Sequence, residues 1–321
     1  MTKPFAEIRF KGTEEEINLQ WLEKRREGIG GSDAAAILSL SKYATPLSVW
    51  LEKTGQVEPE DISDKPPVYW GKVLEDVVAK EYAKRHPEMK VRRLNAMLFS
   101  IEHPFMFASV DRVLTDAQGR KGILEIKTAD KGLTKDWEEG IPLYYLPQPI
   151  HYLAVTGYEF YSVAVLIGGN NYKEFTYERD ESDIETLVKT EKDFWKLVET
   201  NTMPDIVSAD SGILHEAYPD PTMDYLKALD SDIPEIAQYE AICEQINVCK
   251  EKKDELAAKI KKRIGGNRGV VTTTRKITWV RSESTRFATK EFKEKNPDEY
   301  IKYLKTYTRD GGLKVTEIKE K

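Results

Sequence analysis

Three short runs of strand-like sequence constrain the fold of this chain most, because they interrupt a succession of helical patterns. They cover residues 91–100, 105–115 and 122–129, and the segment DAQGRKG between the last two is typical of a turn. We therefore expect an α/β (α+β) fold in which the second and third strands are antiparallel neighbours joined by this turn.

Helical patterns lie on both sides of these strands. Thr13 followed by Glu16 is a capping-box pattern, and Thr45–Pro46 is a typical helix start. A glycine-rich loop, GIGGSD, runs into a short helix that begins at Ser32 or Asp33. Further helices are expected at residues 13–24, 46–54, 68–86, 134–139, 147–155, 182–199, 235–264 and 290–306, and strand pairs at 160–179 and 270–287.

The chain of 321 residues is long enough for one large domain and an appendage. Residues 207–234 are rich in Pro, Asp and Ser, which is typical of a linker. We expect an α/β body over residues 1–206, a linker over 207–234 and a smaller helix and strand module over 235–321.

Composition excludes several classes of protein. No apolar run approaches the roughly 18 to 20 residues that a transmembrane helix needs, and the N-terminus lacks the apolar core of a signal peptide. Cys243 and Cys249 are too few to ligate an iron–sulfur cluster, and their spacing in a helix does not suit a disulfide. We expect a cytoplasmic protein that is neither inserted in a membrane nor bound to one. Its net charge of −6 argues against a protein that coats DNA non-specifically, but not against a locally positive groove.

The candidate chemistry centres on Asp111, Glu125 and Lys127. Residues two apart in a strand point to the same face, so Glu125 and Lys127 project together from GILEIK, and Asp111 can face them from the neighbouring strand. A surface strand would also contain such common residues. The apolar neighbours Ile123 and Leu124 favour a buried strand instead, and buried strands rarely carry an unpaired acid.

Two carboxylates suit a hard divalent cation. Asp111 and Glu125, with the backbone carbonyl of Ile126, would hold one or two Mg²⁺ or Mn²⁺ ions, which prefer oxygen ligands. The cation would polarise a phosphodiester, while Lys127 positions water or stabilises developing charge. Glu75, in GKVLE beside Gly71, is either a further ligand or a solvated helix acid.

A second cluster combines Arg25 and Arg26 with the GIGGSD loop. A glycine-rich loop at a helix start offers N–H donors to an anion, Ser32 adds a hydroxyl, and arginine grips phosphate through two hydrogen bonds. The alternative is that Ser32 or Asp33 only caps the helix.

Gln148 and Tyr152 stand four residues apart in QPIHY, on one face of an expected helix. Both could contact a nucleotide or the attacking water, and Tyr152 could equally be structural.

The order of these motifs resembles the YqaJ-like viral recombinase family, the lambda-type phage exonucleases of the PD-(D/E)XK nuclease superfamily. The resemblance rests on Arg25, IGGSDAA, TPLSVWLEKTG, GKVLE, SVDRVL, LEIK and QPIHY, and extends from about residue 19 to about residue 205. The leading proline of the superfamily motif is here Val110, a change without chemical consequence because proline supplies no ligand.

The resemblance implies a mixed central β-sheet flanked by helices, and Mg²⁺-dependent digestion of one strand of linear duplex DNA from its 5′ end to mononucleotides. It assigns catalysis to Asp111, Glu125 and Lys127, an accessory role to Glu75, the 5′-phosphate to Arg25 and Ser32, and a place beside the active site to Gln148. It further implies a phage or prophage origin, a homotrimer and a single-strand annealing protein as partner.

Basic residues concentrate in residues 250–276, which is consistent with a DNA-tracking face, a partner-docking arm or a solvated helix. Rival functions are another PD-(D/E)XK nuclease, either a restriction endonuclease or a helicase-associated enzyme, and a non-catalytic scaffold that binds DNA ends.

Overall fold

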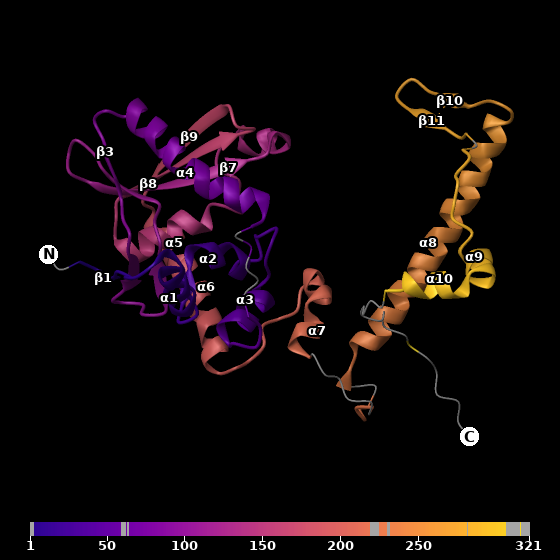
Figure 1. Cartoon of the computed structure of the whole chain (residues 1–321), viewed down its shortest axis with the longest axis horizontal. Coiled ribbons are helices and arrows are strands. Elements are labelled where there is room, and N and C mark those ends of the chain that lie inside the picture. Colours follow the sequence, from indigo (N-terminus) through magenta and orange to yellow (C-terminus); the bar gives the residue numbers. More distant parts are fainter. Residues whose placement is uncertain are drawn as a thin grey trace. The chain divides into compact units, whose positions relative to one another are not determined.

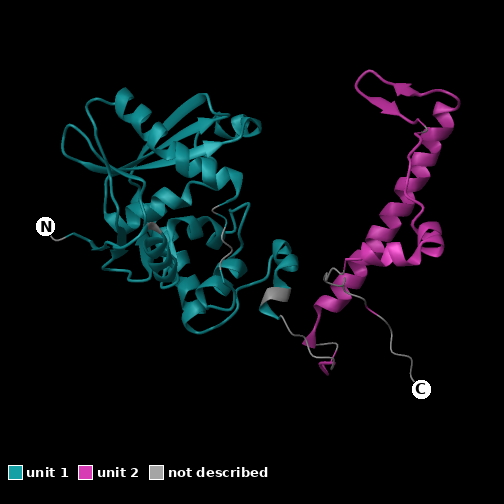
Figure 2. Ribbon diagram, in the orientation of Figure 1, with its two compact units in different colours: residues 1–219 teal, residues 220–321 magenta. Residues whose placement is uncertain are grey.

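The computed structural model describes residues 3–58, 62, 64–218, 225–229, 232–280, 282–305 and 315. The chain divides into two compact units, residues 1–219 and 220–321 (Figure 2). The boundary falls inside the expected linker, of which residues 219–224, 230 and 231 lie outside the described part. The beginning of that segment forms the 3₁₀ helix η2 (Ser208–Gly212) and the short helix α7 (Leu214–Ala217), both within unit 1.

A five-stranded mixed sheet is the centre of unit 1 (Figure 1). Its strand order is β3 (Lys90–Arg93), β6 (Arg112–Thr115), β7 (Lys121–Ala129), β8 (Phe160–Ile167) and β9 (Asn171–Glu178). Neighbouring strands are antiparallel except β7 and β8, which are parallel. Parallel neighbours need a crossover connection, supplied here by the 3₁₀ helix η1 (Lys131–Trp137) and helix α5 (Pro147–Thr156). The expected mixed sheet with flanking helices is confirmed.

Helices cover both faces of this sheet. Helix α4 (Pro66–Arg85) packs on β7 and β8 and places Val78 and Tyr82 against Leu124 and Ile126. Helix α5 packs on the opposite face, where Leu153 joins the core that contains Ile123. Alternate residues of β7 therefore point to different helices, as the period of a strand requires.

A second sheet of four strands corrects the expected strand boundaries. Its order is β1 (Phe5–Ile8), β4 (Met97–Ser100), β5 (Met106–Ala108) and β2 (Ile29–Gly30). The expected strands 91–100 and 105–115 are each two strands, because the chain passes from one sheet to the other at residues 94–96 and 109–111. Asp111 consequently stands at the start of β6 and not late in a continuous strand.

The bounds of four other helices of unit 1 lie close to those expected from the sequence. They are α1 (Glu14–Arg25), α2 (Gly31–Ile37), α3 (Pro46–Lys53) and α6 (Glu181–Glu199). The capping box of Thr13 and Glu16 is present, and Gly157, at φ +66°, ends α5 in the left-handed region. Residues 134–139 were expected to be helical, and η1 instead covers Lys131–Trp137.

Unit 2 consists of a long helix, a short hairpin and two short helices. Helix α8 (Glu235–Ile264) has the expected bounds, and β10 (Gly269–Val271) pairs antiparallel with β11 (Lys276–Thr278). The prediction of a single helix at residues 290–306 is wrong, because this segment contains two short helices. They are α9 (Thr289–Lys295) and α10 (Pro297–Lys302), separated because Pro297 cannot donate the hydrogen bond that would continue α9.

None of the helices in the described ranges is both long and apolar enough to cross a membrane. Cys243 and Cys249 are free thiols.

Candidate active site

The ladder between β6 and β7 brings two acids together. Arg112 pairs with Leu124, so Asp111, one residue earlier, lies beside the following residues of β7. The Asp111 Oδ2 atom accepts a hydrogen bond from the backbone N–H of Ile126 at 2.8 Å. This bond fixes the Asp111 carboxylate next to Glu125.

Glu125 and Lys127 project from the same face of β7, toward α5. The Lys127 ammonium donates to Glu125 Oε1 at 2.8 Å and to Gln148 Oε1 at 2.8 Å. Glu125 is only 3% exposed, and its second oxygen, Oε2, is buried without a hydrogen-bond partner. An unpartnered buried carboxylate oxygen is costly unless something else compensates it.

The charges of this cluster do not balance. Burial and the neighbouring charge of Glu125 hold the pKa of Asp111 well above its usual range, although the Ile126 N–H and the Lys127 ammonium favour ionisation. Burial works against the charged form of Lys127, but Glu125 outweighs it and raises the pKa of the ammonium. Two acids and one ammonium leave an excess of negative charge, which a bound cation would neutralise.

These donors fit a hard divalent cation. Asp111, Glu125 and the backbone carbonyl of Ile126 supply only oxygen, the ligand that Mg²⁺ and Mn²⁺ prefer. Across the described part of the chain, His, Cys, Asp and Glu form no cluster of three or more that could hold a metal ion. A cation here would therefore complete its shell with backbone carbonyl, water or phosphate oxygens.

Glu75 stands on α4, close to Asp111, and its charge contributes to the raised pKa of Asp111. Its Oε1 accepts from Arg112 Nη1 at 2.5 Å, and Asp76 also pairs with the buried Arg112 guanidinium. Arg112 Nη1 donates to the backbone carbonyl of Asp111 at 2.6 Å as well. The structure thus connects Glu75 to Asp111 through Arg112. The Glu75 side chain is held there by the ion pair with Arg112.

A chain of hydrogen bonds leads from Glu125 to Tyr152, and a packing contact of Tyr152 continues it to the glycine-rich loop. Gln148 donates from Nε2 to Tyr152 Oη at 3.0 Å while its oxygen accepts from Lys127, so both ends of the amide are used. Tyr152 packs against Gly31, where a Cβ atom would lie 2.4 Å from the Tyr152 ring and 3.0 Å from Gln148. The absent side chain of Gly31 allows α5 to approach the start of α2.

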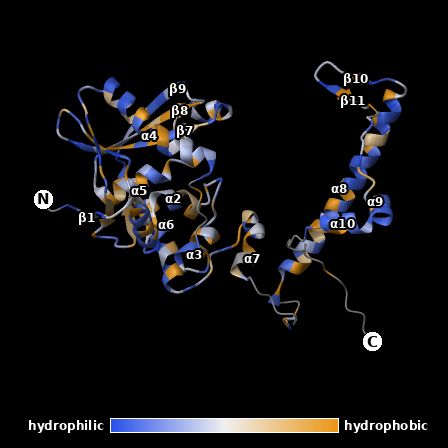
Figure 3. Ribbon diagram, in the orientation of Figure 1, coloured by the Kyte–Doolittle hydropathy of each residue, from blue (hydrophilic) through white to orange (hydrophobic). Residues whose placement is uncertain are grey.

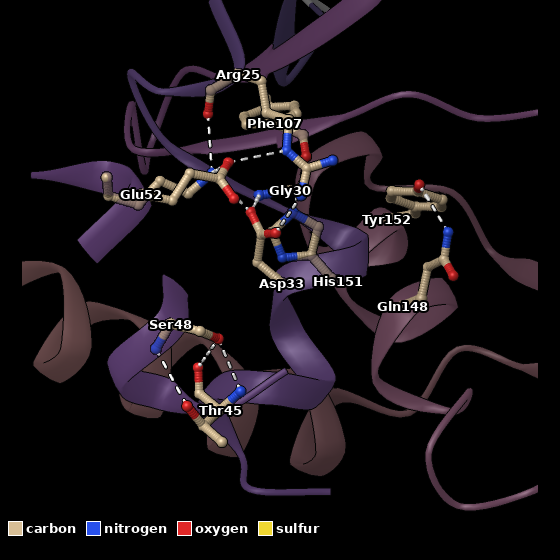
Figure 4. A network of polar contacts seen from close by, with 11 residues as sticks. Arg25, Gly30, Asp33, Thr45, Ser48, Glu52, Phe107, Gln148, His151 and Tyr152 are labelled. Carbon is tan, nitrogen blue, oxygen red and sulfur yellow. Dashed lines mark hydrogen bonds and ion pairs between the residues drawn. The ribbon is translucent and has the colours of Figure 1, made fainter. Parts of the chain in front are cut away.

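Arg25 belongs to a network of alternating charges around Asp33 (Figure 4). Arg25 Nη2 donates to Asp33 Oδ1 at 2.6 Å and its Nε to Glu52 Oε1 at 3.3 Å. Lys53, whose side chain is fully buried, approaches Asp33 Oδ2 at 2.9 Å and donates to the backbone carbonyl of Arg25 at 3.0 Å. Burial alone would raise the pKa of Asp33, but Lys53 and Arg25 hold it far below its usual value.

The remaining residues of the second cluster lie at the surface. Neither Ser32 nor Asp33 is the N-cap of α2, which is Gly30; the buried Asp33, at the third helical position, accepts from the Gly30 N–H with Oδ2 at 3.0 Å. Ser32 is exposed in the first turn of α2, and Arg26 pairs with the exposed Glu58. The hydroxyl of Ser32 is thus accessible to a ligand.

Three residues that contact the two clusters were not singled out from the sequence. Arg112 follows Asp111 directly, and an arginine in an apolar strand is itself a signal of a buried ion pair. Lys53 stands in the WLEKTG segment, with nothing in its local sequence to indicate burial. Tyr145 places its ring 5.0 Å from the Lys127 ammonium, in the YYLPQ segment before α5.

Most of these residues lie in a segment that matches the model of a known protein family. The model of the YqaJ-like viral recombinase domain matches residues 20–159, a range that contains Arg25, Asp111, Glu125 and Tyr152. A relative from Bacillus subtilis (strain 168), named "Uncharacterized protein YqaJ", is 39% identical over 324 residues. The match covers 98% of this chain and 99% of the relative.

Solved structures are similar at lower levels. An alkaline exonuclease from Laribacter hongkongensis, LHK-Exo, is 17% identical with a TM-score of 0.48, and the match covers 57% of this chain and 94% of that one. Its complex with dAMP matches over the same shares, at 18% identity and a TM-score of 0.48. A phage related exonuclease from Haemophilus somnus 129PT is 11% identical with a TM-score of 0.41, covering 56% of this chain and 99% of that one.

Proposed function

Because the chain belongs to the YqaJ-like viral recombinase family, we propose that it is a divalent-metal-dependent exonuclease. It degrades one strand of linear double-stranded DNA from the 5′ end, releases mononucleotides, and leaves a 3′ strand for recombination by single-strand annealing.

The buried acid pair carries this proposal. Asp111 and Glu125 lie side by side, and Glu125 Oε2 has no hydrogen-bond partner in its buried position. A scaffold that only binds DNA ends would have no use for a buried, unbalanced pair of acids, whereas a phosphodiesterase needs them.

Asp111, Glu125 and the Ile126 carbonyl would hold Mg²⁺ or Mn²⁺. When bound, such a cation polarises the scissile phosphate and makes water more acidic. Glu75 is a candidate third carboxylate for the cation: its charge contributes to the raised pKa of Asp111, and it holds Arg112, which donates to the Asp111 backbone carbonyl.

Lys127 and Gln148 act on the reacting groups. The Lys127 ammonium, oriented by Glu125 and Gln148, positions the attacking water or stabilises the charge that develops on the phosphate. Gln148 is in turn fixed by Tyr152, so the ammonium has a defined direction before substrate arrives.

Arg25 and Ser32 contact the terminal 5′-phosphate, with Arg26 and Tyr152 nearby on the DNA path. Arg25 is electrostatically coupled to Tyr152 as well as to Asp33 and Glu52. A phosphate at this position would share Arg25 with carboxylates that already hold its guanidinium in place. Preorganised in this way, Arg25 loses little side-chain entropy on binding.

The proposal includes the setting in which the enzyme works. Its substrate is linear duplex DNA in the cytoplasm of a bacterial host, it assembles as a homo-oligomer, with a trimer as the first expectation, and a single-strand annealing protein coats the exposed 3′ strand.

The test is digestion of linear duplexes labelled at the 5′ or the 3′ end of one strand, with and without a 5′-phosphate, in Mg²⁺ or in EDTA. We expect Mg²⁺-dependent release of the 5′ label as a mononucleotide and no cleavage of closed circles. Cleavage of circles would indicate an endonuclease of the same superfamily, and tight binding without cleavage would indicate a scaffold. A Glu125→Gln preparation controls for contaminating nuclease.

A further inference from the structure

Helix α8 exposes a regular apolar seam that the nuclease proposal does not use. Its members alternate at spacings of three and four residues, the period of a coiled coil. They are Tyr239, Ile242, Ile246, Cys249, Lys253, Leu256 and Ile260. Figure 3 shows apolar positions recurring along the otherwise polar helix.

The seam is exposed along its whole length. Tyr239 is 40% exposed, Ile242 55%, Ile246 46%, Leu256 51% and Ile260 39%. Of the described residues of α8, only Ile264, at the end of the helix, has a buried side chain. A helix of 30 residues, roughly 45 Å long, gains most of its stability from packing an apolar face, so this face fits a partner helix.

The charges of α8 divide the helix into two halves. Residues 235–249 contain three glutamates and no basic residue, whereas residues 250–264 contain seven basic and three acidic residues. Two parallel copies would place the basic halves side by side. Two antiparallel copies would place each basic half against an acidic half, which makes the helix complementary to itself.

We propose that α8 pairs with α8 of a second copy of this chain as an antiparallel coiled coil along the seam. Lys253 is the one charged member of the seam, and a single polar residue at such a position selects register and orientation at some loss of stability. The pairing does not depend on the nuclease activity, and it joins copies two at a time through unit 2, as a contact separate from the one that would form a trimer.

Cross-linking of the full-length chain tests orientation directly. In a background of Cys243→Ser and Cys249→Ser, Ile242→Cys and Ile260→Cys are made as separate proteins with tags of different size. In an antiparallel pair, position 242 of one copy lies near position 260 of the other. Two equivalent positions lie about 27 Å apart, too far for a short bismaleimide reagent.

We expect the mixture of the two proteins to cross-link, with at least about tenfold less product from either protein alone, because only the mixture brings thiols together across the seam. Self-cross-linking of Ile242→Cys at the level of the mixture would mean parallel helices and would overturn the proposal. Absence of a product in the mixture would overturn it too.

A matched pair of variants tests the seam itself. Ile246→Glu places a charge in the seam, whereas Val248→Glu places one on an equally exposed apolar residue outside it, since Val248 is 54% exposed. We expect Ile246→Glu to lower the cross-link yield at least about tenfold and Val248→Glu to leave it within about twofold, because only the first buries a charge at the interface. Equal loss in both variants would show that this face is not the interface.

Discussion

The buried pair of His151 and Glu191 gives a sharp test of how unit 1 is held together. Both side chains have no solvent exposure, and His151 Nδ1 lies 2.8 and 2.9 Å from the Glu191 oxygens. His151 Nε2 donates to the Phe107 carbonyl at 2.8 Å, so the pair joins α5 and α6 to β5. Removing one partner from a buried ion pair costs about 3–5 kcal/mol. For a unit of this size Glu191→Ala should lower Tm by about 6–20 °C.

The pH dependence has a definite sign. Burial lowers the pKa of His151, but Glu191 outweighs it, with help from Asp33, and the pKa is raised. Burial likewise raises the pKa of Glu191, against the opposing effects of His151 and His103. Both groups therefore bind protons more tightly in the folded protein than in the unfolded one. The contribution of His151 is fully present below the unfolded histidine pKa of about 6.5 and is lost as pH rises through its raised value. The contribution of Glu191 is fully present only below the unfolded glutamate pKa of about 4.3 and is lost as pH rises through its own raised value.

Glu191→Gln should reverse this dependence. A neutral glutamine can donate to His151 Nδ1 and keep the geometry, but without a carboxylate beside it burial disfavours the imidazolium. The variant should then lose stability as pH falls below about 6.5. Calorimetric Tm values between pH 5 and 9, for wild type, Glu191→Gln and the exposed control Glu185→Gln, measure the slopes. Parallel slopes for wild type and Glu191→Gln would show that the carboxylate of Glu191 does not keep His151 protonated.

The remaining predictions concern the candidate site. Lys127→Ala should lower the hydrolysis rate at least about 10²-fold yet leave DNA affinity in Ca²⁺ within about threefold, because Lys127 acts on developing charge; a matched loss of binding and rate would argue against this role. Gly31→Ala should destabilise unit 1 by about 1–3 kcal/mol, since its Cβ would lie 2.4 Å from Tyr152, while Gly212→Ala, with open space around it, should change unfolding free energy little. Arg25→Lys should reduce the rate preference for 5′-phosphorylated over 5′-hydroxyl ends about tenfold by losing bidentate contact; an unchanged preference would place the phosphate elsewhere.

Local periodicity was enough to find the parts of the site that stand on regular elements. Glu125 and Lys127 share a face because β7 is an uninterrupted strand of nine residues. Gln148 and Tyr152 bond to each other because α5 is regular through both positions. In each case the spacing alone determines the geometry.

Features that depend on contacts between separate helices and strands could not be predicted from local periodicity. Residues 105–115 look like one strand, and only the pairing of β5 with β4 and of β6 with β7 shows that the chain changes sheets before Asp111. The carboxylate partners of Arg25 stand on α2 and α3, and no local sequence pattern predicts that these helices meet α1 at Arg25. The end of helix α9 before Pro297 could have been predicted from the sequence, because a proline inside a helical pattern ends or kinks the helix.

The proposed nuclease activity depends on Asp111 and Glu125 holding a divalent cation. Its most direct test is the initial rate of mononucleotide release from a 5′-phosphorylated linear duplex, measured across Mg²⁺ concentrations for wild type and Glu125→Gln. We expect a saturable Mg²⁺ dependence for wild type and a rate at least about 10³-fold lower for the variant at every concentration. A Glu125→Gln rate within about tenfold of wild type would contradict it, because an essential cation ligand cannot be replaced by an amide at so small a loss.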